Sequence, residues 1–88
     1  MNTEARCLGA ALRASRAILN WSQTTLAEKT NISILTISRI ETCKVEARYS
    51  IYIKIIRALN EAGVNINFTS MYTGFTIEVK EELFKKEV

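Results

Sequence analysis

The sequence predicts a mainly α-helical protein that ends in a β-hairpin. Up to Gly63, apolar side chains recur every three or four residues, which is the period of an amphipathic helix. After Gly63 they alternate with polar side chains over residues 64–69 and 75–80, which is the period of half-buried strands. The 88 residues are therefore expected to form a single domain with three parts: a helical core (1–63), a hairpin (64–80) and a charged tail (81–88).

The first helix is expected to begin near the amino terminus, because Asn2 or Thr3 can cap it, and to end near Asn20. Three leucines and two small residues fall on one side of this helix at helical spacing: Leu8, Leu12, Leu19, Ala11 and Ser15. This side is expected to face the core.

Two short helices joined by a tight turn are expected next. Ser22 can cap the first of them, over residues 23–29, and Ser33 can cap the second, which should end near Thr42. Asn31 lies in the turn between them and tolerates a left-handed backbone better than most residues. The sequence therefore predicts a helix, a three-residue turn and another helix.

A fourth helix is expected over residues 50–62, with Gly63 at the position where helices stop. Its apolar residues follow helical spacing: Ile51, Ile55, Ala58, Leu59 and Ala62. The two strands that follow are separated by a short loop that contains Gly74. The charged tail is expected to form a helical turn or to be frayed.

The composition argues against an enzyme. The chain has no histidine and no aspartate, which removes the Ser-His-Asp arrangement and imidazole metal sites. Its three glycines are far apart, so it has no glycine-rich phosphate loop, and its two cysteines cannot complete a structural zinc site. We therefore expect no cofactor and no metal.

The charge is unevenly distributed. Residues 1–57 carry nine basic and four acidic side chains, a net charge of +5, whereas residues 58–88 carry three basic and five acidic side chains, a net charge of −2. A basic amino-terminal part permits binding to a polyanion such as nucleic acid. No apolar stretch is long enough to cross a bilayer, no signal peptide is recognisable, and the two thiols are expected to be reduced, so a cytoplasmic location is expected.

The second and third helices meet the packing conditions of a DNA-binding helix-turn-helix motif. The small Ala27 allows the helices to approach closely, and Asn31 suits the turn. Four apolar residues are placed to hold the two helices together: Leu26, Ile32, Ile37 and Ile40.

At this level of detail the chain resembles the Xre-type helix-turn-helix domains of phage repressors and Cro proteins. The residues that carry the resemblance are Leu8-Gly9, Leu12-Arg13, Arg16, Trp21-Ser22-Gln23, Leu26-Ala27-Glu28, Ile32-Ser33, Thr36-Ile37-Ser38-Arg39-Ile40-Glu41, Arg57-Ala58-Leu59 and Ala62-Gly63. The resemblance covers residues 8–63 and implies a four-helix, lambda-repressor-like domain that binds double-stranded DNA. It also implies a regulator of transcription, with repression as the leading expectation.

The third helix is expected to enter the major groove. With about 100° per residue, placing Ile37 and Ile40 inward turns Leu35, Ser38 and Arg39 outward together with Thr42. The residues expected to contact DNA are Gln23, Ser33, Ile34, Leu35, Thr36, Ser38, Arg39, Thr42, Lys44 and Arg48.

Arg39 is the best candidate for direct readout, because a guanidinium pairs bidentately with guanine. The resemblance implies that Gln23 contacts a phosphate and also braces the third helix; Lys44 and Arg48 are expected to be sequence-independent phosphate contacts. It further implies a structural ion pair between Arg16 and Glu41.

Ile34 and Leu35 depart from the family pattern, which more often has polar residues there. Apolar side chains at these positions can contact thymine methyl groups. Ile34 can alternatively lie at the edge of the core, and Leu35 can alternatively meet a protein partner.

The hairpin is expected to pack on the helices, because an isolated two-stranded hairpin is only marginally stable. Its outer edge is then available to the same edge of a second copy, which predicts a twofold homodimer. Such a dimer would place two recognition helices about 34 Å apart, on successive major grooves of an inverted-repeat operator. The hairpin residues assigned to this assembly are Val64, Ile66, Phe68, Phe75, Ile77 and Val79.

Two other functions stay open at this point. The chain is alternatively an antitoxin-type protein that binds DNA and also neutralises a partner protein through Leu35 or the hairpin. It is alternatively a protein-interaction module that has lost DNA binding, although Gln23, Arg39 and Lys44 argue against this.

Overall fold

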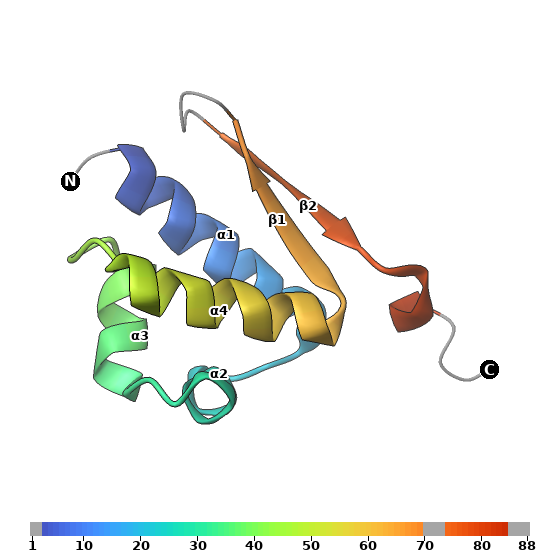
Figure 1. Ribbon diagram of the computed structural model, residues 1–88, viewed down its shortest axis with the longest axis horizontal. Helices are drawn as coiled ribbons and strands as arrows, with labels where there is room; N and C mark the ends of the chain where they lie inside the picture. Colours follow the sequence, from blue (N-terminus) through green and yellow to red (C-terminus); the bar gives the residue numbers. More distant parts are fainter. Residues whose placement is uncertain (1–2, 70–73, 85–88) are drawn as a thin grey trace.

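Four α-helices, an antiparallel pair of strands and one turn of 3-10 helix make up the computed structural model, which describes residues 3–69 and 74–84 (Figure 1). The elements are α1 (Thr3–Leu19), α2 (Gln23–Thr30), α3 (Ile34–Glu41), α4 (Tyr49–Ala62), β1 (Val64–Phe68), β2 (Phe75–Val79) and η1 (Glu81–Phe84). The predicted fold class is confirmed: four helices precede a hairpin.

Serine side chains begin the two short helices, as the sequence predicts. The Ser22 hydroxyl accepts a hydrogen bond from the backbone N–H of Thr25 at 2.9 Å, and the Ser33 hydroxyl accepts one from the N–H of Thr36 at 3.1 Å. Each bond satisfies a donor that the first turn of a helix leaves without a partner. α1 already includes Thr3 as its first residue, and the alternative cap Asn2 lies outside the described residues.

Left-handed residues end the helices. Asn20, Asn31 and Cys43 have φ values of 59°, 58° and 62°, and Gly63 has a φ of 105°. After α3, the N–H of Cys43 bonds to the carbonyl of Ile40 at 3.1 Å, and the N–H of Lys44 bonds to the carbonyl of Arg39 at 2.8 Å. This pair of bonds is a Schellman motif, in which glycine usually takes the left-handed position. Here a cysteine takes it.

The core lies between α1, α4, the helix-turn-helix pair and β1. In Figure 1 α4 crosses the front of the molecule, with α2 and α3 below it and the hairpin above it. The buried apolar residues come from every one of these elements: Leu8, Ala11, Leu12, Leu26, Ile32, Ile37, Ile40, Ile55, Leu59, Val64 and Ile66. Trp21 packs against this core, with the Lys29 ammonium 5.2 Å from the centre of its ring.

The hairpin covers the helices with its apolar face. The register pairs Val64 with Val79, Ile66 with Ile77 and Phe68 with Phe75, so all six apolar side chains lie on one face. β1 contacts α4, and both strands contact α1. Val64 and Ile66 are buried in the core, at 1% and 7% exposed, whereas the four other residues are half-buried.

The charged tail begins with a helical turn, one of its two expected forms. The N–H of Lys80 donates to the carbonyl of Gly63 at 2.8 Å, and Leu83 packs where a side chain at Gly63 would lie. Residues 85–88 of the tail lie outside the described residues. Among residues 3–69 and 74–84, we find no helix with the length and apolar character that a membrane span requires.

Candidate nucleic-acid interface

The third helix, α3, has one buried side and one exposed side. Ile37 and Ile40 face the core and are 0% and 1% exposed. The opposite side, here called the reading face, consists of Ile34, Leu35, Ser38 and Arg39 with Thr42 at the end of the helix. Ile34 is 45% exposed and Leu35 is 56% exposed, so the alternative of Ile34 at the core edge is wrong. The helical period predicted this orientation for Leu35, Arg39 and Thr42, which are exposed, and for Ser38, which is half-buried.

The hydroxyl groups at the two ends of α3 have local partners. The Ser33 hydroxyl donates to Thr36 Oγ1 at 2.9 Å, and the Thr42 hydroxyl donates to the carbonyl of Ser38 at 2.9 Å. Thr36 is half-buried. Arg39 is exposed, and its guanidinium has no polar partner among residues 3–69 and 74–84. The guanidinium is therefore available to bind a ligand.

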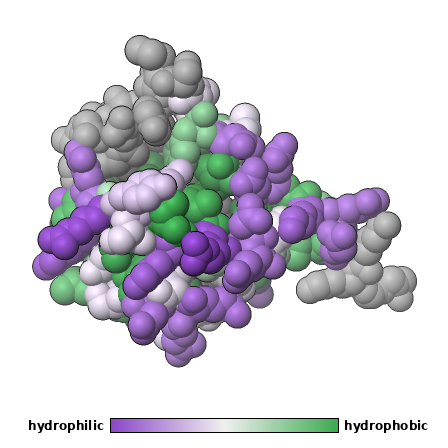
Figure 2. Space-filling view, viewed as in Figure 1, coloured by the Kyte–Doolittle hydropathy of each residue, from purple (hydrophilic) through white to green (hydrophobic). Residues whose placement is uncertain are grey.

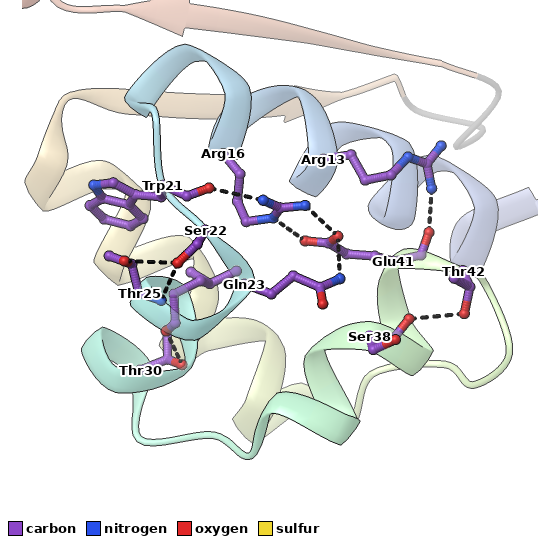
Figure 3. Close-up of polar contacts among 11 residues, drawn as sticks. Arg13, Arg16, Trp21, Ser22, Gln23, Thr25, Thr30, Ser38, Glu41 and Thr42 are labelled. Carbon is purple, nitrogen blue, oxygen red and sulfur yellow. Dashed lines mark hydrogen bonds and ion pairs between the residues drawn. The ribbon is translucent and has the colours of Figure 1, made fainter.

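A buried carboxylate fixes α3 to the two preceding helices. Glu41, only 1% exposed, receives hydrogen bonds from Arg16 Nε at 2.6 Å and from Arg16 Nη2 at 2.9 Å (Figure 3). Gln23, the first residue of α2, donates its amide to the same carboxylate at 3.0 Å. Both carboxylate oxygens thus have partners, which offsets the cost of burying the charge.

The same ion pair determines the electrostatics of Arg16. The hydrogen bonds to Glu41 raise the pKa of Arg16 above its ordinary value; burial opposes this rise and the negative charge of Glu41 adds to it. Arg16 Nη1 also donates to the backbone carbonyl of Trp21 at 2.9 Å, which ties the connection between α1 and α2 to this pair. Arg16 and Glu41 thus form an ion pair, and Gln23 contacts the same carboxylate.

Two further residues of α1 position α3, and the sequence reasoning gave neither a role. Arg13 Nη1 donates to the backbone carbonyl of Glu41, at the end of α3 where the helix dipole favours a positive charge. One turn earlier, a Cβ built at Gly9 would lie 2.8 Å from the carbonyl oxygen of Ile40. The glycine therefore permits the close crossing of α1 over α3. The sequence did hold a signal for this crossing: a glycine inside a helical pattern, with arginines four and seven residues after it.

The remaining expected phosphate contacts lie in the connection after α3. Lys44 and Arg48 are both exposed. The N–H of Lys44 bonds to the carbonyl of Arg39 at 2.8 Å, which fixes the backbone of Lys44 at the end of α3. Arg48 is the N-cap residue of α4 and makes no side-chain cap bond. Two exposed basic side chains therefore come directly after α3 in the sequence.

Tyr49, next to Arg48, was not singled out from the sequence, and it is 76% exposed. It begins a row of aromatic rings that continues through Tyr52 and Phe68 to Phe75, with 6.4 Å between the centres of successive rings. In Figure 2 apolar side chains gather where α4 and β1 meet, with polar side chains around them. The row joins α4 to the hairpin.

The residues assigned to the dimer lie apart from the reading face. In Figure 1 the hairpin and α3 are on opposite sides of α4. Val64 and Ile66 are core residues of a single chain and offer almost no surface to a second copy. Any contact that uses this face must involve Phe68 on β1 and the half-buried residues Phe75, Ile77 and Val79 on β2.

Comparisons with known proteins agree with this geometry. A family model described as helix-turn-helix matches residues 12–62. The crystal structure of the clp gene regulator ClgR from Corynebacterium glutamicum is similar to this chain, with 30% sequence identity and a TM-score of 0.61. The similarity covers 65% of this chain and 61% of the chain of the regulator. The matched part is therefore less than two thirds of the length of the regulator. A comparison with curated proteins found no match.

Proposed function

The chain belongs to the Xre-like helix-turn-helix family. From this premise we propose that it regulates transcription by binding double-stranded DNA at specific sequences. Its recognition helix, α3, enters the major groove with the reading face toward the base edges. A protein of this kind acts in the cytoplasm, where it meets its operator.

One observation carries the proposal: the reading face is exposed while the opposite side of the same helix is held rigidly. The guanidinium of Arg39 belongs to this face and has no polar partner among the described residues, and the buried Glu41 on the other side has bonds to two helices. A fixed helix gives its side chains a defined position relative to base edges. Preorganisation of this kind lowers the conformational cost of binding.

Phosphate contacts complete the proposed interface. Gln23 is the first residue of α2, and a helix N-terminus favours an anion because its first N–H groups have no acceptor within the helix. Lys44 and Arg48 supply two exposed cations after α3. Contacts of this type orient the protein on the duplex and carry no sequence information. Sequence preference is assigned to Arg39 and the other side chains of the reading face.

We further propose that the regulator is a homodimer that acts as a repressor. The half-buried apolar residues of β2 and the free outer edges of a two-stranded sheet support a second copy at the hairpin. The resemblance to phage repressors and Cro proteins supports repression, because a dimer on an inverted repeat excludes other proteins from that DNA. The dimer also gives the two half-sites their spacing.

The second candidate function is an antitoxin-type protein that binds DNA and a partner protein. It is favoured by the exposure of two large apolar side chains, Ile34 and Leu35, on the same helix as Arg39. A protein-interaction module without DNA binding rests on these two residues alone. The availability of Arg39 argues against that third reading.

The proposal is tested by selection of bound duplexes from a random DNA pool at near-physiological salt, followed by sequencing. We expect an enriched inverted repeat whose half-sites are about one helical turn apart. Retention of duplexes without enrichment, and with strong salt dependence, would leave a non-specific binder. No retention would contradict the proposed function and favour the protein-interaction alternative.

A further inference from the structure

The first turn of α3 presents apolar chemistry where a DNA reader usually presents polar groups. Ile34 and Leu35 are consecutive, belong to the reading face and are 45% and 56% exposed. The core of this helix is supplied by Ile37 and Ile40, so neither exposed residue is needed for packing. Two adjacent large apolar side chains are left in solvent at the leading end of the proposed recognition helix.

The hydroxyl groups of Ser33 and Thr36, on either side of Ile34 and Leu35 in the sequence, bond to each other. Ser33 Oγ accepts the N–H of Thr36 and donates to its hydroxyl oxygen, at 3.1 Å and 2.9 Å. This end of α3 therefore offers a base edge mainly aliphatic surface. In the major groove the apolar group on a natural base edge is the C5-methyl of thymine. The methyl of 5-methylcytosine occupies the same ring position and is chemically equivalent.

We propose that Ile34 and Leu35 bind the C5-methyl groups of pyrimidines, so that the site distinguishes thymine from uracil and 5-methylcytosine from cytosine. The inference rests on the proposed function, since it assigns the ligand group of that same interface. It adds a regulatory consequence: methylation of cytosine at the contacted position strengthens binding instead of blocking it.

The position of Arg39 adds a spacing to this readout. Arg39 follows Leu35 by four residues, which is about 6 Å along the helix axis at 1.5 Å per residue. Leu35 and the guanidinium of Arg39 would therefore meet different but nearby base pairs of one half-site.

The experiment measures affinity by fluorescence anisotropy on the selected duplex, with thymine replaced by uracil at one position of each half-site at a time. Removing a buried methyl group is expected to weaken binding about fourfold per half-site, and about 15-fold for both half-sites together. At the same position, cytosine should bind weakly and 5-methylcytosine should restore a large part of the affinity.

Variants then assign the effect to residues. Leu35→Ala should remove most of the difference between thymine and uracil, and Ile34→Ala should reduce it. Ile18→Ala is the matched control, because Ile18 is also aliphatic and 44% exposed but lies at the end of α1, so the full difference should persist. All three side chains are exposed, and their loss leaves the core intact.

The two proposals fail in different ways. If the protein binds its selected duplex and every uracil duplex binds equally well, methyl recognition is refuted and the DNA-binding function stands. Persistence of the thymine preference in both Leu35→Ala and Ile34→Ala would refute the assignment to these residues. If no duplex is bound at all, the proposed function fails, and methyl recognition fails with it.

Discussion

Arg16 Nε lies 2.6 Å from Glu41 Oε2, and this contact joins α1 to α3 across 25 residues of sequence. Gln23 adds a second helix to the same carboxylate, and Arg13 bonds to the backbone of Glu41. α3 is therefore oriented by polar contacts from both preceding helices as well as by its apolar side. These contacts hold its reading face in a defined position.

Arg16→Ala should destabilise the fold by about 3 kcal/mol, because it leaves the buried Glu41 carboxylate without its ion-pair partner. This is a large part of the roughly 5–10 kcal/mol expected for a domain of this size. Urea unfolding at neutral pH measures the loss. Arg39→Ala is the control, since Arg39 is exposed and its removal should change stability by less than about 0.5 kcal/mol.

The contribution of Arg16 should not vary with pH around neutrality. Its pKa is raised in the folded state, so its stabilisation is complete below the unfolded pKa and is lost only as the pH rises through the folded value. Both pKa values lie far above neutrality. The difference in unfolding free energy between wild type and Arg16→Ala should therefore stay constant as the pH rises from neutrality. A difference that falls steeply near pH 7 would contradict this account.

Arg39→Ala should relax sequence preference at one base position in each half-site, at a cost of about 1–3 kcal/mol. Lys44→Ala should weaken binding to all duplexes alike. It should also reduce the slope of log affinity against log salt concentration by about one, the loss of one released counterion. Titration of the selected site and of a scrambled duplex at several salt concentrations separates the two effects. Equal behaviour of the two variants would refute the division into base and phosphate contacts.

Gly9→Ala should destabilise the fold by about 1–3 kcal/mol and weaken specific DNA binding, because the added Cβ would lie 2.8 Å from the backbone carbonyl of Ile40. The helix that must move away is α3. Gly74→Ala is the matched control: among residues 3–69 and 74–84, its Cβ would meet only Thr69 Cγ2, at an ordinary 3.9 Å. Thermal unfolding of both variants tests the difference. A stability loss of the same size in Gly74→Ala would show that the crossing of α1 over α3 is not the cause.

Cys43→Gly should stabilise the protein by up to about 1 kcal/mol. Cys43 takes the left-handed position of the motif that ends α3, with a φ of 62°, and glycine adopts this conformation without the steric cost of a Cβ. The gain is limited by the contacts of the cysteine side chain, which are lost. Cys43→Ala keeps the Cβ and should show no such gain in urea unfolding. Equal midpoints for the two variants would mean that backbone strain at this position is negligible.

The protein should sediment as a dimer at tens of micromolar, and one dimer should bind each inverted repeat. Analytical ultracentrifugation with and without the selected duplex measures this. A duplex with one half-site is the control, and it should bind much more weakly because the second recognition helix loses its contacts. Monomer alone under both conditions would contradict the proposed assembly.

Local signals in the sequence were sufficient for the element boundaries. Ser22 and Ser33 cap helices, and Asn31 and Gly63 end them, because capping and left-handed turns depend on a few neighbouring residues. The change of apolar period after Gly63 located the hairpin, and its two strands pair as expected. Helical spacing also predicted which side of α3 is exposed, since the wheel follows from local geometry alone.

Contacts between distant segments were decided by the tertiary structure. The sequence did not reveal that Gly9 permits α1 to cross α3 or that Arg13 bonds to the end of that helix. It left two positions open for Ile34, which the packing of the whole helix resolves as exposed. The alternating pattern placed Val64 and Val79 on the same apolar face of the hairpin, and the two residues do pair across it. The pattern did not show that only Val64 is fully buried. Period and composition determine which side of an element is apolar, but the depth of burial depends on which other elements cover it.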